Sequence, residues 1–206
     1  MLAAGDVATA AAWNVITNDV IDHESRINDS GMVIMTPTSV SGTGVTSSGG
    51  LITLSAATAP IINGVFTSSY ENYKMLITDV SGSTAALFSI RLTVAGTPQQ
   101  GATDYGYSLL QSASAGAVIN LDFNASGTSL MAIGYKTTTG KSNSTLEISS
   151  PNFAVSSNIL VSGAYVATPY FGGGAMGAQI ACDGFTIVPS SGNITAKIRV
   201  YGYQNS

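Results

Sequence analysis

The chain has 206 residues, of which 45% are hydrophobic and only 9% are charged, and its formal net charge is −4. This length and apolar content suffice to bury the core of one ordinary domain. Its seven basic residues are too few and too scattered for a nucleic-acid-binding patch. No apolar run approaches the roughly 18 residues of a membrane-inserted helix. With so little charge, the surface must be neutral and hydroxyl-rich or must lie against other chains.

Residues 6–28 carry the one convincing helical pattern, which Asp6 begins as a favourable N-cap. The a and d stripe of a heptad repeat follows, with spacings of three and four between Trp13, Ile16, Val20, His23 and Ile27. We predict a coiled-coil-like helix within residues 1–30 that joins copies of the chain. The simpler alternative is a helix that packs on its own domain. His23 is interpreted as a buried polar residue that fixes register, not as a metal ligand.

Residues 31–60 form a second region. Met32–Met35 and Leu51–Leu54 are short apolar runs typical of strands. Between them, residues 36–50 are rich in Ser, Thr and Gly, a composition that predicts a linker or loose loop. We therefore expect the main domain to span residues 61–206.

The main domain opens with two strand-like runs, Tyr73–Val80 and Phe88–Val94, on either side of a small-residue turn at 81–84. In the second run apolar and polar residues alternate, which predicts a half-buried strand. We interpret the pair as a hairpin that opens a β-sandwich. Further strand patterns occur at 105–110, 118–123, 131–135, 146–148, 159–166, 185–188 and 194–203. Residues 167–184 are predicted to be a long loop with a flexible tip of three glycines. About eight antiparallel strands predict a β-sandwich or jelly roll behind the N-terminal helix.

Residues with catalytic chemistry are scarce. A hydrolytic triad needs a histidine, and the single histidine lies in the predicted helix. Cys182 is the single cysteine and has no partner base in its neighbourhood of the sequence. Most acidic residues of the β-domain fall on outer strand faces or in turns, which explains them without a paired-carboxylate site. The sequence predicts no enzyme, no cofactor and no metal site.

Aromatic residues in or beside the predicted loops suggest ligand binding. Tyr105, Tyr107, Tyr170 and Phe171 lie among Asn, Gln and Ser residues. Aromatic rings and amide or hydroxyl groups together suit the stacking and hydrogen bonding of sugars. We predict that these side chains face a receptor such as a cell-surface polysaccharide; the alternative is that about half of them belong to the core.

Several stretches resemble bacteriophage tail-fibre and minor tail proteins. The run NGVFTSSYENYKMLITDV at 63–80 is similar to the opening of a β-domain of that family. ISSPNF at 148–153 and CDGFTIVPSSGNITAKIRVYGYQN at 182–205 are similar to its later strands. GDVATAAAWNVITNDVIDHESRI at 5–27 resembles the short helix that precedes such domains.

The resemblance implies a trimeric jelly-roll head behind a helical stem that contacts other virion proteins and serves host adsorption. It also implies that the chain is made in the bacterial cytoplasm and ends in the virion. Two alternatives remain open. One is a capsid decoration or head-fibre protein, and the other, from a different class, is a glycan depolymerase.

Overall fold

A computed structural model describes residues 31–112, 119–128, 130–166 and 168–204, which form sixteen strands and no helix. Among these residues, accordingly, no helix has the length and hydropathy to cross a membrane. The strands are β1 (Met32–Ile34), β2 (Ser39–Ser41), β3 (Val45–Ser48), β4 (Leu51–Ala57), β5 (Ile61–Asn63), β6 (Asn72–Ser81), β7 (Ala86–Val94), β8 (Thr97–Pro98), β9 (Tyr105–Ser112), β10 (Ile119–Thr128), β11 (Met131–Lys136), β12 (Ser142–Ser149), β13 (Ser157–Tyr165), β14 (Thr168–Met176), β15 (Gly184–Pro189) and β16 (Ile194–Tyr203).

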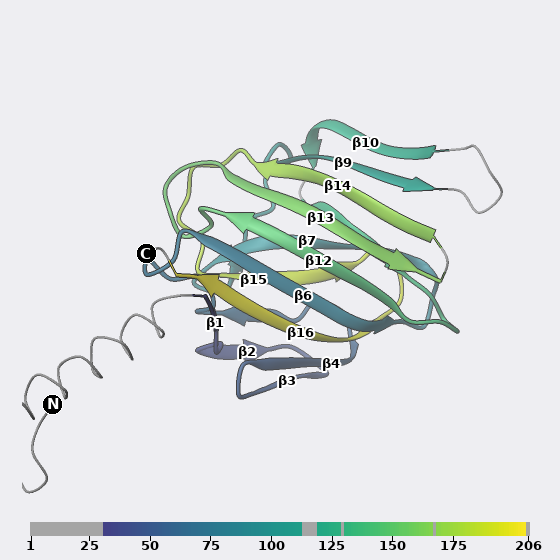
Figure 1. Ribbon diagram of the computed structural model, residues 1–206, viewed down its shortest axis with the longest axis horizontal. Helices are drawn as coiled ribbons and strands as arrows, with labels where there is room; N and C mark the ends of the chain where they lie inside the picture. Colours follow the sequence, from purple (N-terminus) through teal and green to yellow (C-terminus); the bar gives the residue numbers. More distant parts are fainter. Residues whose placement is uncertain (1–30, 113–118, 129, 167, 205–206) are drawn as a thin grey trace, which may run out of the picture.

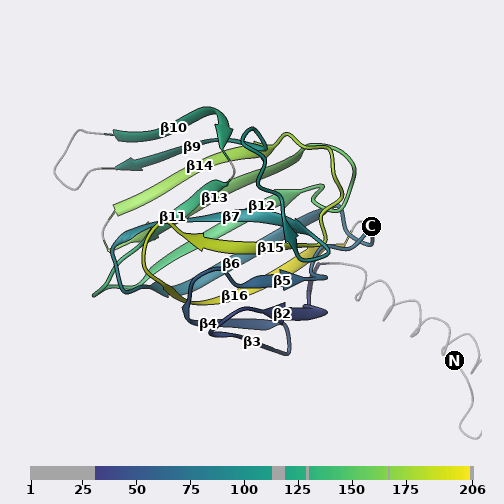
Figure 2. The same ribbon diagram turned by 180° about the vertical axis from the view of Figure 1, so that it is seen from behind.

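The strands form two antiparallel layers. The larger sheet has ten strands in the order β10-β9-β14-β13-β12-β6-β16-β4-β3, with β1 also paired to β16, and lies toward the viewer in Figure 1. The smaller sheet has six strands in the order β11-β7-β15-β5-β2, with β8 paired to β7, and lies in front in Figure 2. Each sheet therefore has one inner face toward the other sheet and one outer face.

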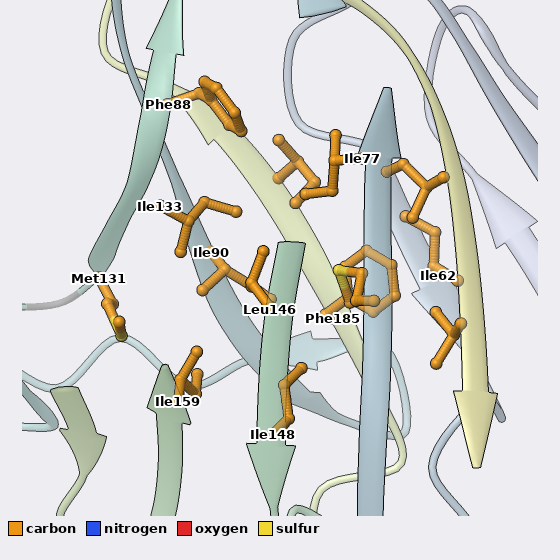
Figure 3. Close-up of a cluster of buried hydrophobic side chains, with 14 of the residues drawn as sticks. Ile62, Ile77, Phe88, Ile90, Met131, Ile133, Leu146, Ile148, Ile159 and Phe185 are labelled. Atoms are coloured by element: carbon orange, nitrogen blue, oxygen red, sulfur yellow. The ribbon is translucent and has the colours of Figure 1, made fainter. Parts of the chain in front are cut away.

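The core lies between the two inner faces. Along β6 the buried residues Tyr73, Met75 and Ile77 alternate with half-buried residues on the outer side. Phe88 and Ile90 of β7 lie opposite, in the cluster that Figure 3 shows. Because side chains of a strand point alternately to its two faces, an apolar residue at every second position produces this layer. Burial of each such side chain contributes about 1.5–3 kcal/mol to stability.

The predicted hairpin of residues 73–94 is wrong. β6 belongs to the ten-stranded sheet and β7 to the six-stranded sheet, so the two strands face each other across the core and do not pair. The turn between them crosses from one layer to the other, and the Gly82 N–H donates to the Thr137 carbonyl at 3.0 Å. Two consecutive apolar strands fit either arrangement, because both arrangements bury one face of each strand.

Two segments predicted as loops contain strands. Within residues 36–50, β2 pairs with β5 and β3 pairs with β4, so this Ser/Thr/Gly-rich stretch joins the two sheets and is not a linker. Within residues 167–184, β14 lies between β13 and β9, and the glycines at 172–174 are part of its ladder. Small residues fit a strand as well as a loop where neighbouring strands approach closely, and periodicity alone gave no signal for either.

The predicted fold class is corrected accordingly. The described residues are all β, with twice as many strands as the roughly eight expected of a jelly roll. The helix predicted within residues 1–30, with Trp13, Ile16, Val20, His23 and Ile27, lies outside the described residues.

The close approach of β9 and β14 gives a first testable prediction. A Cβ atom added at Gly172 would lie 2.2 Å from the Ser108 carbonyl oxygen, whereas one added at Gly106 of β9 would meet nothing within 4 Å. We expect Gly172→Ala to lower the free energy of unfolding by about 1–3 kcal/mol, because the two strands must move apart. Gly106→Ala is the matched control and should change it by less than about 1 kcal/mol. Urea denaturation measures both, and equal effects would contradict the close packing.

Candidate functional site

The structure separates the four aromatic residues that the sequence predicted to face a receptor. Tyr105 and Tyr170 are 1% and 2% exposed and lie in strands, not in loops. The Leu92 N–H donates to the Tyr105 hydroxyl at 2.9 Å, and the Tyr170 hydroxyl donates to the Asn143 carbonyl at 2.5 Å. Both side chains are therefore part of the interior and not available to a ligand.

The other two aromatic residues differ in exposure. Tyr107 of β9 is half-buried and packs against the core. Phe171 of β14 is 60% exposed and lies on the outer face of the ten-stranded sheet. Of the four predicted residues, Phe171 alone is largely accessible, and it points to the outer face of the sheet as the surface to examine.

One row of residues crosses this outer face from strand to strand. Tyr201 of β16 is registered opposite Lys74 of β6, and Lys74 is opposite Glu147 of β12. Glu147 in turn is opposite Leu160 of β13. Antiparallel register places such opposite side chains about 5 Å apart on one face, so the row is a continuous strip of neighbouring groups.

At the centre of the strip, the Glu147 carboxylate has a partner for each of its two oxygens. Lys74 Nζ lies 3.0 Å from Glu147 Oε1, and the Tyr203 hydroxyl donates to Glu147 Oε2 at 2.7 Å. The side chains of Lys74 and Glu147 are 30% and 40% exposed, so water reaches both. An exposed ion pair of this kind contributes at most about 1 kcal/mol to stability, so its main consequence is the placement of the groups around it.

This contact directs the Tyr203 side chain across the sheet. β16 and β12 are separated by β6, which puts their backbones about 9.6 Å apart. To meet Glu147 across that gap, the Tyr203 side chain must lean along the sheet surface over β6 instead of standing upright. The hydrogen bond to the carboxylate raises the pKa of Tyr203 to about 12, which keeps its hydroxyl a donor. The result is an aromatic ring fixed on the outer face beside an ammonium and a carboxylate.

Tyr203, Glu147 and Lys74 were not singled out from the sequence as site residues. The alternation of Ile194–Tyr203 does place Tyr201 and Tyr203 on the outer side, and Glu147 stands between two apolar residues of its strand. The local sequence pattern does not give the strand order, so it cannot show that β16 and β12 lie on either side of β6. The sequence could therefore have shown that these three side chains lie on the outer face, but not that they lie close to one another.

Three other acidic side chains of the described residues have partners elsewhere. Asp79 Oδ2 accepts from Lys197 Nζ at 2.8 Å, which lowers the pKa of Asp79. Asp183 Oδ1 accepts the Ala95 N–H at 2.9 Å, and Asp104 Oδ2 accepts the Gly101 N–H at 2.5 Å. Within the described ranges, no hydrogen bond joins two carboxylates, and no three His, Cys, Asp or Glu side chains gather as metal ligands.

Comparison with known proteins gives distant likenesses alone. No known family and no curated protein matches the chain. Peanut lectin is 9% identical, with a TM-score of 0.31, over 85% of this chain and 99% of its own. Domain 4 of the arabinanase AbnA from Geobacillus stearothermophilus, solved with arabinotriose, is 14% identical, with a TM-score of 0.29, over 85% and 84%. The SPRY domain of human HERC1 is 10% identical, with a TM-score of 0.25, over 85% and 100%. These values are too low to carry an argument about function.

The buried phenols and thiol predict a loss of stability at alkaline pH. Burial raises the pKa of Tyr170 from 10.0 and of Cys182 from 9.0, each to about 12, and Tyr203 reaches about 12 through Glu147. Burial also raises the pKa of Tyr105. The unfolded chain releases these protons at lower pH, so their contribution to stability is complete below pH 9 and is lost as pH rises toward 12. Lys136 opposes this trend, because burial lowers its pKa.

We therefore expect the urea midpoint to fall steadily between about pH 9 and about pH 12. The urea midpoint of Tyr203→Phe should fall less steeply with pH than that of the natural sequence, because this variant lacks one of the hydroxyls that keep their protons in the folded state. Identical slopes in the two proteins would show that the hydrogen bond between Tyr203 and Glu147 does not form in solution.

Proposed function

We propose that this chain is a non-catalytic adhesion protein that binds a glycan of a cell surface through the outer face of its ten-stranded sheet. The observation that carries the proposal is the placement of Tyr203 on that face, where its hydroxyl donates to Glu147 Oε2 at 2.7 Å. The proposed site consists of Lys74, Glu147, Tyr201 and Tyr203.

The chemistry of a sugar ring matches these groups. A pyranose has an apolar C–H face, which stacks on an aromatic ring, and a rim of hydroxyls, which need donors and acceptors. Tyr203 supplies the ring, Lys74 donates, and the remaining lone pairs of Glu147 accept. Since Lys74 and Glu147 already neutralise one another, the site favours a neutral sugar over a charged one.

Attachment to a surface does not require tight binding at one site. A shallow site on a sheet face binds a single sugar unit weakly, whereas several copies on one particle raise the overall affinity by about 10²–10⁴. The resemblance of residues 63–80 and 182–205 to phage tail proteins supports placing this chain on a tailed phage virion. In that setting the host-surface glycan is the ligand and adsorption is the role.

We favour binding over hydrolysis of the glycan because of the spacing of the acids. A glycosidase pair needs two carboxyl groups about 5–9.5 Å apart. The described acids nearest in this part of the chain are Glu71, three residues before Lys74, and Asp79, five residues after it. These separations correspond to about 10 Å and about 16 Å along a strand, both outside that range. Glu147 also has both oxygens engaged, one by Lys74 and one by Tyr203.

Substitution of the site should remove binding and leave the fold intact. We expect Tyr203→Ala and Glu147→Gln each to weaken retention on an array of bacterial surface polysaccharides by about tenfold or more, as loss of an aromatic anchor or of the group that places it does. Retention of the purified full-length chain on the array is the measurement.

Asp79→Asn provides the matched control, because Asp79 and Lys197 form the other described ion pair, on exposed side chains of β6 and β16. This variant should bind like the natural sequence. If Tyr203→Ala keeps its circular dichroism spectrum and binds undiminished, or if no polysaccharide retains the natural sequence, the proposed function fails.

A further inference from the structure

The charged residues on the outer face of the ten-stranded sheet gather on three of its middle strands. The half formed by β12, β6 and β16 carries Lys74, Asp79, Glu147, Lys197 and Arg199. The neighbouring strands β13, β14, β9 and β10 contain a single charged residue, Asp122, and it is registered opposite the buried Leu109 and not opposite an outer-face residue. These four strands are adjacent in space, as Figure 1 shows, and we call their outer face the uncharged half.

Two large apolar side chains stand out from the uncharged half. Leu160 of β13 is 63% exposed, and Phe171 of β14 is 60% exposed. Where β13 and β14 pair, the residues opposite them are small, since Leu160 faces Gly173 and Phe171 faces Ser162. On its other side Phe171 is registered opposite Leu110 of β9, which extends the apolar surface. A Cβ atom at Gly173 would lie 2.9 Å from Leu160 Cδ2, so the leucine lies over the glycine. Leu160 and Phe171 therefore project beside the smaller Ser162 and Gly173, and another protein surface can pack against them.

The same half ends in an open strand edge. β10 is the outermost strand of the sheet and pairs with β9 on one side only, over ten residues. At the opposite edge of the sheet, β3 has only four residues. This edge contains no lysine and no proline, and its one protective feature is an irregularity in the pairing with β9 between Asn124 and Thr128. An uncharged apolar face beside such an edge is typical of a surface that is covered in the assembled protein.

We propose that the uncharged half packs face to face against the uncharged half of a second copy of this chain. The occupant must itself be nearly free of charge and apolar, because a charged surface would lose its hydration against Leu160 and Phe171 without gaining a partner. The uncharged half has this chemistry, whereas the adjacent strands β12, β6 and β16 carry charges, and the short strands β1, β3 and β4 beyond them offer less area. A patch that contacts itself is the requirement of a two-fold interface.

The area is sufficient for a stable contact. The four strands are eight to ten residues long. At about 4.8 Å between strands and about 3.3 Å per residue, they cover about 550 Å² per copy, or about 1,100 Å² for the pair. This exceeds the roughly 1,000 Å² expected of a specific interface. Glu147, registered opposite Leu160, marks its border, so the Tyr203 site stays open beside it.

Protection of an engineered thiol tests this contact directly. Ser162→Cys is placed in a Cys182→Ala background of the full chain, and Thr78→Cys in the same background is the matched control. Both positions are exposed on the outer face, Ser162 in the uncharged half and Thr78 in the charged half. In the purified protein we expect the thiol at 162 to react with a maleimide at least about tenfold more slowly than the thiol at 78, because the interface excludes the reagent.

Addition of Phe171→Glu to the Ser162→Cys chain should restore the fast reaction, because a buried carboxylate opposes the contact. Light scattering of the natural sequence should give a mass above the 20.9 kDa of one chain. The proposal is overturned if the natural sequence is a single chain at every concentration, or if the thiols at 162 and 78 react equally fast. It is equally overturned if protection at 162 arises only on addition of a polysaccharide, which would assign the patch to a ligand. None of these results depends on whether Tyr203 binds a glycan.

Discussion

The contact between the inner faces of the two sheets constrains everything else in this protein. Met75 and Ile77 of β6 and Phe88 and Ile90 of β7 are fully buried between the layers. Because strand side chains alternate, each inward residue fixes its two neighbours on the outer face. A slip of one residue would bury Lys74 and expose Tyr73. The register that the core requires therefore also decides which side chains can meet a ligand or another chain.

Buried tyrosines strengthen this constraint. The Tyr105 hydroxyl of β9, in the large sheet, accepts from the Leu92 N–H of β7, in the small sheet. The Tyr170 hydroxyl lies 2.6 Å from Ser144 Oγ, and Ser144 Oγ donates to the Ile133 carbonyl of β11. Each phenol thus satisfies a polar group where the two sheets meet, which a phenylalanine would leave unpaired. Tyr105 and Tyr170, which the sequence suggested as ligand-binding residues, instead form hydrogen bonds in the interior.

The few charged residues of the outer face are concentrated on its middle strands, and the neighbouring strands are almost free of charge. Along the middle strands they form two ion pairs, and one of these holds Tyr203 in place. The strands from β13 to β10 have almost none, and there Leu160 and Phe171 stay exposed. On our two proposals, one half of the sheet binds a ligand and the other half binds another copy. One sheet can provide both surfaces because four further strands, β13, β14, β9 and β10, lie beside the charged strands.

The sequence by itself determined which segments alternate, and so it predicted most long strands and an antiparallel β-sandwich. Its last strand, Ile194–Tyr203, is observed with the predicted bounds and faces. It did not determine the layer of each strand, so β6 and β7 were paired in error, and it gave no signal for β14 in a run of glycines. It also placed Tyr105 and Tyr170 toward a receptor, although both are buried. Periodicity is local, whereas the order β16-β6-β12 that brings Tyr203 to Glu147 arises from pairing between distant segments, and only the tertiary structure decides it.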